Sequence, residues 1–275
     1  MVAEVIGSVL TGSLALLADA GHMFTDAAGI LLAVLAVTFA SRAATPSRTF
    51  GYYRLEILAA VFNAVLLFAV GVFILYEAWQ RWFAPPAVEG GLMLVFALVG
   101  LVANVIGVRL LHAHAEHSVN VKGAYLEVLG DLFGSIAAII AALLIAVFGW
   151  ERADVIASIA VALLILPRTV LLLREAVDVL LEATPKGLEL AQLRARVCGH
   201  PGVLDVHDVH AWTISSGMPV ISLHVVVSDD VLAVAGGAQV LDELAACLAT
   251  EFGIEHSTIQ LEPSSHAAHE FETHD

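Results

Sequence analysis

Residues 123–148 read GAYLEVLGDLFGSIAAIIAALLIAVF, and the class of the fold can be inferred from them. The stretch is long and apolar enough for a helix that crosses a lipid bilayer, yet it carries Glu127 and Asp131 four residues apart. Side chains at this spacing lie on one face of a helix. An ionised group at the bilayer centre costs roughly 2.5 to 3.5 kcal/mol on insertion scales. We therefore expect this pair to have a function.

A second apolar stretch repeats the arrangement. Residues 13–40 read SLALLADAGHMFTDAAGILLAVLAVTFA, in which His22 and Asp26 are also four residues apart. Imidazole and carboxylate groups are ligands of divalent metal ions. The residues alone leave a second interpretation open, in which His22 and Asp26 form a structural hydrogen-bonded pair between helices.

The composition predicts a membrane protein. Hydrophobic residues make up 59% of the chain and charged residues 14%, and the mean hydropathy is +0.88. Soluble domains have an apolar share near half and a charged share near a quarter. Five apolar runs are each long enough to cross a hydrocarbon core about 30 Å thick. These runs are 13–40, 55–79, 91–112, 123–148 and 153–181.

The first ten residues, MVAEVIGSVL, predict the end of a sixth apolar helix, because they cover only about half of the hydrocarbon core. We interpret them as a truncated first span rather than a secretory signal, since no basic segment precedes them. Six spans place both termini on one side. Basic residues at the ends of the spans indicate that this side is the cytoplasm: Arg42, Arg48, Arg54, Arg109, Lys122, Arg174 and Lys186, against Arg81 and Arg152 on the other side.

A second domain is predicted where long apolar runs give way to short alternating ones, next to Thr184 and Pro185. The pattern there is typical of helix, strand, strand, helix, strand, in the ranges 185–199, 203–215, 220–228, 230–252 and 257–262. This αββαβ order fits a small α+β domain with helices on one face of an open sheet. We expect a transmembrane domain, a cytoplasmic domain and a His-rich disordered tail, in the ranges 1–182, 183–263 and 264–275.

Charge and motifs exclude several functional classes. A formal charge of −15 argues against nucleic acid as a partner, because phosphate binding needs a basic face. Cys198 and Cys247 form no CxxC motif, and in the predicted cytoplasmic part their thiols stay reduced. The chain has no GxSxG or HExxH motif, so the sequence does not predict an enzyme.

Five segments together resemble the cation diffusion facilitator family. They are SLALLADAGHMFTDAAGI (13–30), FGYYRLEILAAVFNAVLLF (50–68), GAYLEVLGDLFGSIAAI (123–139), LLEATP (180–185) and GVLDVHDVHAWTISSGMPVISLHVVV (202–227). The resemblance follows the family's order over essentially the whole chain. It implies a six-helix antiporter, in a bacterial inner membrane or other plasma membrane, that exchanges cytoplasmic divalent metal, commonly zinc, for protons. It also implies a homodimer with a metallochaperone-like cytoplasmic domain.

The family's transport site, carried over onto this sequence, falls on His22, Asp26, Glu127 and Asp131. Position 127 departs from the pattern, since zinc-transporting relatives usually have histidine there. Nitrogen and oxygen ligands suit tetrahedral zinc, but three ionised carboxylates leave the loaded site at −1. We therefore expect one carboxylate to hold a proton in part of the cycle. The added carboxylate makes the site harder, and oxygen-rich sites suit manganese better than nitrogen-rich sites do. Zinc nevertheless remains the expected ion, with manganese, cobalt, iron or cadmium as alternatives.

The resemblance also implies a regulatory metal site in the cytoplasmic domain. Its expected ligands are His207, His224, His256 and Glu262, with His210 or Asp208 as substitutes. Strand alternation places His207 and Asp208 on opposite faces. Histidines packed and hydrogen-bonded at the domain surface are the other interpretation.

A short His-rich tract, LHAHAEHSVN, lies between the fourth and fifth of the six predicted spans and carries His112, His114 and His117. Such tracts bind metal loosely, and a polar loop without fixed geometry is an equal alternative. A membrane metal sensor, with structural intramembrane ligands, is the alternative function for the whole chain.

Several other polar residues of the apolar runs are given no place among the ligands. Arg168 next to Pro167 predicts a kink or an internal pairing site. Asn63 and Asn104 favour hydrogen bonds between helices. Asp19 fits the outer mouth of the site, a supporting position behind the ligands, a helix cap or a pair with another helix.

Overall fold

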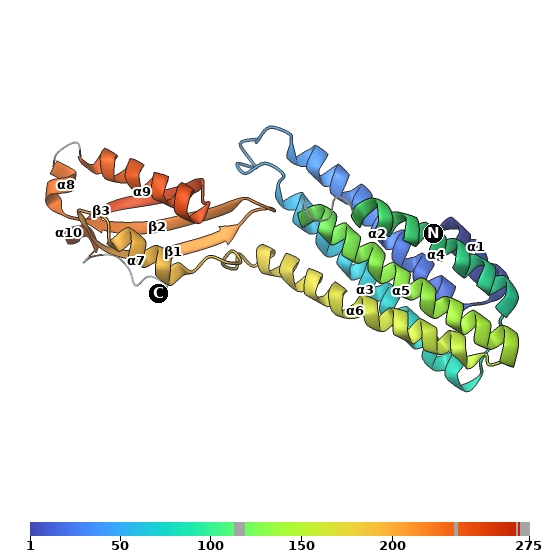
Figure 1. Ribbon diagram of the computed structural model, residues 1–275. Coiled ribbons are helices and arrows are strands. Elements are labelled where there is room, and N and C mark those ends of the chain that lie inside the picture. The colour runs from blue at the N-terminus through green and yellow to red at the C-terminus, as the bar shows by residue number, and fades with distance from the viewer. Residues whose placement is uncertain (113–118, 234–235, 268, 270–275) are drawn as a thin grey trace. The chain divides into compact units, whose positions relative to one another are not determined.

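The computed structural model of the protein describes residues 1–112, 119–233, 236–267 and 269. The chain divides into two compact units (Figure 1). The first unit, residues 1–35 and 58–174, is helical, and the second, residues 36–57 and 175–275, contains a three-stranded sheet. The expected fold class, an all-α transmembrane bundle joined to a small α+β domain, is confirmed.

Six helices build the first unit, and three of them, α2, α3 and α6, extend into the second. They are α1 Val2–Thr11, α2 Leu14–Ala40, α3 Arg54–Phe83, α4 Gly90–His112, α5 Val119–Phe148 and α6 Arg152–Leu180. Among the described residues, five of these helices are long and apolar enough to cross a membrane, and α1 is a shorter apolar helix. The five predicted full spans are therefore present.

Small side chains fill the interior of the helical unit. Ala138 and Ala142 are almost fully buried, and a Cβ added at Gly90 would lie 2.8 Å from the backbone nitrogen of Ala146. Leu14, Leu16 and Met93 are buried with them, but many large apolar side chains point outward, and Val147 is 68% exposed. Lipid tails are as apolar as leucine, so close approach of helix backbones, rather than apolar burial, holds such a bundle together.

Asp154, on α6, fixes the start of α2. Gly12 ends α1 with a φ of +71°, a left-handed conformation that glycine adopts at low cost. The buried Asp154 carboxylate then accepts hydrogen bonds from the Ser13 hydroxyl at 2.6 Å and from the backbone N–H groups of Leu14 and Ala15 at 2.7 and 3.1 Å. It satisfies donors that a helix start leaves without a partner, and its negative charge is favourable there.

The second unit is a sheet covered on one face by helices. Its elements are α7 Leu190–Cys198, β1 Val203–Thr213, β2 Pro219–Val227, α8 Asp229–Ala233, α9 Gly236–Phe252, β3 His256–Pro263 and α10 Ser264–Ala267. The central strand β2 pairs antiparallel with β1 and parallel with β3. Leu193 of α7, Leu223 of β2 and Leu248 of α9 are fully buried in one core. The expected αββαβ order is confirmed.

Two details of this unit differ from the prediction. The single helix expected over 230–252 corresponds to α8 and α9, and residues 234–235 between them lie outside the described residues. The tail, expected to be disordered from residue 264, begins with the short helix α10.

A bulge interrupts β1 between His207 and His210. Asp208 has a φ of +49°, in the left-handed region that aspartate enters more readily than most residues. Because one residue is added to the strand, Val206 and Val209 are both buried on the helix-covered face, three residues apart instead of two.

The second unit also includes residues 36–57. This segment contains the end of α2, the start of α3 and the connection between them. Arg54 Nη2 lies 2.6 Å from Glu182 Oε1, and the Phe50 ring contacts the His256 ring edge-on, with 5.6 Å between centroids. Residues 36–57 therefore contact residues of the second unit, and the domain boundary expected at residue 183 stays a prediction.

We expect Asp154→Ala to destabilise the protein, because it leaves buried donors at the start of α2 without an acceptor. Each such donor costs about 1 to 3 kcal/mol. The melting temperature of the purified protein in detergent should fall, and it should fall less for Asp154→Asn, which keeps one acceptor oxygen. The exposed Asp242 offers a control, and an Asp154→Ala protein that melts together with Asp242→Ala contradicts the assignment.

Candidate metal centres

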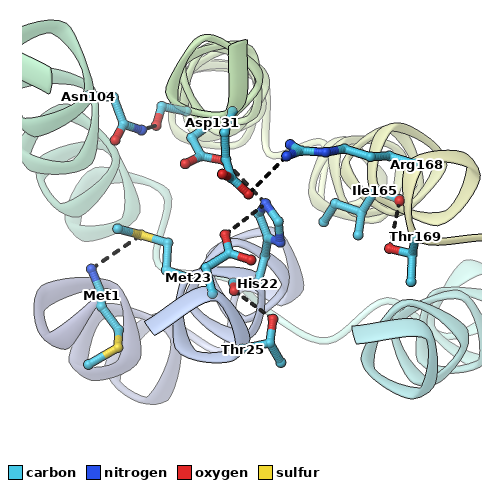
Figure 2. Close-up of polar contacts among 12 residues, drawn as sticks. Met1, His22, Met23, Thr25, Asn104, Asp131, Ile165, Arg168 and Thr169 are labelled. Carbon is cyan, nitrogen blue, oxygen red and sulfur yellow. Dashed lines mark hydrogen bonds and ion pairs between the residues drawn. The ribbon is translucent and has the colours of Figure 1, made fainter. Parts of the chain in front are cut away.

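The four residues predicted for the transport site come from two helices of the first unit. His22 and Asp26 lie on α2, and Glu127 and Asp131 lie on α5. His22 Nε2 is 3.4 Å from Asp26 Oδ2 and 3.3 Å from Asp131 Oδ1. Figure 2 shows His22 and Asp131 reaching toward one another from the two helices. Three of the four donors therefore meet directly at the His22 ring.

These spacings suit a shared ion. Ligand atoms at 2.0 to 2.2 Å from a tetrahedral zinc lie about 3.3 to 3.6 Å from one another. The two distances from His22 Nε2 fall in this range. The side chains are largely buried, with exposed fractions of 10% for His22, 22% for Asp26 and 11% for Asp131. Little donor rearrangement is needed for one divalent cation to bind between them.

A cavity of about 210 Å³ opens beside these donors. Its polar lining consists of Asp19, His22, Asp26, Asn63, Glu127, Asp131, Arg168 and Thr169. The remaining lining residues are glycines and aliphatic side chains from α3, α5 and α6. All four predicted ligands therefore face one space, which can hold a cation with part of its water shell.

Glu127 reaches the cavity but pairs with a different partner. Its Oε1 lies 3.1 Å from Arg168 Nη2, an ion pair between α5 and α6. Figure 2 shows the Arg168 side chain extending from α6 toward the side of the site where Asp131 lies. The sequence analysis allowed an internal pairing role for Arg168 but did not connect it with the ligands. An arginine in the middle of an apolar run was the available signal.

The other polar residues of the bundle divide into two groups. Asn104 Nδ2 donates to Ser135 Oγ at 3.0 Å, which is an interhelical hydrogen bond as expected. Asp19 is 4% exposed and lines the cavity. It does not cap α2, because Asp154 accepts the hydrogen bonds at the start of that helix. Asn63 also lines the cavity, and its buried Oδ1 accepts no hydrogen bond from the described residues. Asp19 and Asn63 therefore border the ion's space without belonging to the four-residue set.

A second group of donors lies on the open face of the sheet. One ligand atom from each of His207, His224 and Glu262 lies within 4.8 Å of the other two. His224 Nδ1 is 2.9 Å from Glu262 Oε1, and His207 Nε2 is 3.6 Å from Glu262 Oε2. Register explains the group, because His207 is directly opposite His224, and Glu262 follows on β3 beside Val226. Two imidazoles and a carboxylate form a three-ligand set typical of zinc.

The bulge in β1 adds Asp208 to this surface. Asp208 Oδ2 lies 3.8 Å from His224 Nε2, and its Oδ1 lies 2.8 Å from His210 Nε2. The prediction that His207 and Asp208 lie on opposite faces is therefore wrong. It assumed unbroken alternation, and the left-handed conformation at Asp208 turns this side chain toward the histidines.

His256 is not brought into this group. It begins β3 and pairs with Val220, whereas Glu262 pairs with Val226. Six residues of strand separate the two side chains by about 20 Å. His256 instead contacts Phe50, so a site built within one chain does not include it.

The loop histidines are only partly described. His112 is exposed at the end of α4, and its ring lies 5.6 Å from that of Tyr125 between centroids. His114 and His117 lie outside the described residues. The expected collecting site at this loop stays a prediction.

Comparison with protein families finds two matches that cover most of the chain. Residues 1–181 match the cation efflux transmembrane domain. Residues 185–264 match the cytoplasmic domain of cation efflux proteins. The two ranges meet beside Thr184 and Pro185, where the composition changes.

Curated relatives are similar over nearly the whole chain. The metal cation efflux system protein CzcD of Cupriavidus metallidurans is 45% identical over 262 residues, which cover 95% of this chain and 82% of that protein. The zinc transporter ZitB of Escherichia coli is 46% identical over 264 residues, with coverages of 95% and 83%. The cadmium, cobalt and zinc/H(+)-K(+) antiporter of Bacillus subtilis is 40% identical over 268 residues, with coverages of 97% and 86%.

Proposed function

The chain belongs to the cation efflux family, and on this premise we propose that it exports divalent metal ions, zinc above all, from the cytoplasm in exchange for protons. It is a multi-pass membrane protein with its C-terminal domain in the cytoplasm. The observation that carries the proposal is the meeting of His22, Asp26 and Asp131 at ligand-like distances beside one cavity of the helical unit.

The proposed transport site consists of His22, Asp26, Glu127 and Asp131. Each helix contributes two donors at i, i+4, so a helix that moves carries its pair with it. Metal ions bind the deprotonated forms of these ligands, so metal entry releases protons and an excess of protons releases metal. This competition supplies the exchange, and no covalent step is needed.

Zinc is the proposed ion because imidazole and carboxylate ligands at these spacings fit its tetrahedral preference. The names of two similar proteins support this choice, since one is a zinc transporter and the other a cadmium, cobalt and zinc antiporter. Cadmium and cobalt are the first alternatives to test, followed by manganese and iron. Selectivity among them is part of the proposal and rests on flux measurements.

We include a regulatory metal site on His207, His224 and Glu262 in the proposal, and a homodimer formed through the cytoplasmic domain. Support comes from the three converging donors and from the match of residues 185–264 to the family's cytoplasmic domain. Metal bound there favours whichever arrangement of the cytoplasmic domains binds it more tightly, and it shifts the population accordingly.

The transport proposal predicts that Asp131→Ala abolishes proton-driven zinc uptake in proteoliposomes that contain the full chain. A lost ligand should reduce the initial rate at least about tenfold, since even supporting residues around metal ligands contribute about 10- to 100-fold. An imposed pH gradient and an encapsulated zinc-sensitive dye provide the measurement. The exposed Asp242→Ala variant is the control. Zinc binding without gradient-dependent flux in the wild type contradicts export and favours the sensor.

The cytoplasmic site predicts a difference between two histidines. His224→Ala should remove about one bound zinc per protomer, because it deletes one of three ligands, whereas His256→Ala should leave the number unchanged. Isothermal titration of the purified full chain counts the bound ions. Loss of the same zinc in His256→Ala would show that the site needs His256, which a partner subunit would then have to supply.

A further inference from the structure

Arg168 is the arginine of the cavity lining, and the proposed transport mechanism gives it no role. It lies inside α6 after Pro167, sixteen residues from the start of that helix. Its Nη2 contacts Glu127 Oε1 at 3.1 Å, and it lines the cavity together with Asp26 and Asp131. Arginine stays protonated in proteins. It is therefore a fixed positive charge beside the donors.

Charge balance gives this contact a consequence. Ionised Asp26, Glu127 and Asp131 carry −3, and a divalent ion bound to them leaves −1. Counting Arg168, the four proposed ligands and their ion-pair partner carry −2, and a bound divalent ion makes this set neutral; Asp19, which lines the same cavity, stands outside the set. Neutrality matters because uncompensated charge in an apolar bundle is unfavourable. Arg168 thus supplies the compensation for which the sequence analysis had invoked a retained proton.

The same contact reduces what Glu127 offers to a metal ion. Arg168 pairs with Oε1 of Glu127, so Oε2 is the oxygen outside this ion pair. The glutamate and the arginine together have a net charge of zero, and Oε2 gives the pair one donor atom, as a neutral imidazole has. Glu127 and Arg168 together therefore offer the site what a neutral histidine at position 127 would offer, one donor atom without net charge.

We propose that Arg168 is a positioning residue of the transport site, which pairs with Glu127 so that the two residues act as one neutral, single-donor ligand unit and set the site's affinity for a divalent ion. The proposal rests on the proposed transport function. On this proposal the ion specificity of the site depends on the pair formed by Glu127 of α5 and Arg168 of α6. The identity of the ligands alone would attribute that specificity to Glu127.

The experiment is a double-mutant cycle on zinc transport, with Glu127→His, Arg168→Gln and the double variant in full-length protein in proteoliposomes. Glu127→His alone leaves Arg168 as an excess positive charge, so KM for zinc should rise at least about tenfold. Arg168→Gln alone makes the site more negative, so KM should fall while kcat falls about tenfold, because metal leaves slowly. The double variant has the −2 charge again and should return both constants to within about threefold of wild type.

Two further variants separate charge from packing. Arg168→Lys keeps the charge and should retain the wild-type KM. Arg174→Gln removes a cation from the same helix outside the cavity lining and should change neither constant. If Arg168→Gln alone does not fold, the comparison of KM between Glu127→His and the double variant still tests the role of Arg168.

Each outcome separates the two levels of the proposal. A wild-type protein without pH-driven zinc uptake overturns the proposed function, whatever the variants do. With wild-type uptake present, a double variant no better than Glu127→His overturns the role of Arg168. So does a folded Arg168→Gln variant whose kcat falls with unchanged KM, because that pattern indicates only a structural ion pair.

Discussion

An ionised side chain inside an apolar helical bundle has to find its partner within the protein, because hydrocarbon offers none. This constraint explains the contacts that organise the first unit. Asp154 is held by the donors at the start of α2, and Glu127 is held by Arg168. His22 lies between two carboxylates. Around His22 the carboxylates outnumber the positive charges, and this excess negative charge favours the binding of a cation.

The two candidate metal centres hold their donors by different means. In the bundle, each helix keeps its own i, i+4 pair, and only the distance between α2 and α5 can change when the helices shift. In the sheet, His207 and His224 are fixed opposite one another by backbone hydrogen bonds. Relative helix motion therefore alters the first site and leaves the second intact. The helix pairs in the bundle suit a site that has to release its ion. The fixed strand pair in the sheet suits a site that only senses whether metal is bound.

Hydropathy and helical periodicity were sufficient to predict the five long helices and the position of His22 and Asp26 on one helix face, since both depend on local sequence. The partner of Glu127 was not predictable in this way, because it depends on which faces of α5 and α6 meet. Asp208 shows the same limit in the sheet, because a single residue in the left-handed conformation turned its side chain toward the histidines. The separation of His256 from Glu262 was predictable, since six residues of one strand place the two about 20 Å apart.

Coordination number links the ion pair to selectivity. A free glutamate can bind a metal ion through both oxygens, and calcium, with six to eight oxygen ligands, exploits this. In this bundle Arg168 pairs with Oε1 of Glu127, so on our proposal each of the four ligands offers the ion one donor atom. Four donors favour a small four-coordinate ion such as zinc over larger ions that need more oxygens. On the proposed function, the third carboxylate therefore adds oxygen atoms to the site but does not raise the number of oxygens that bind the ion.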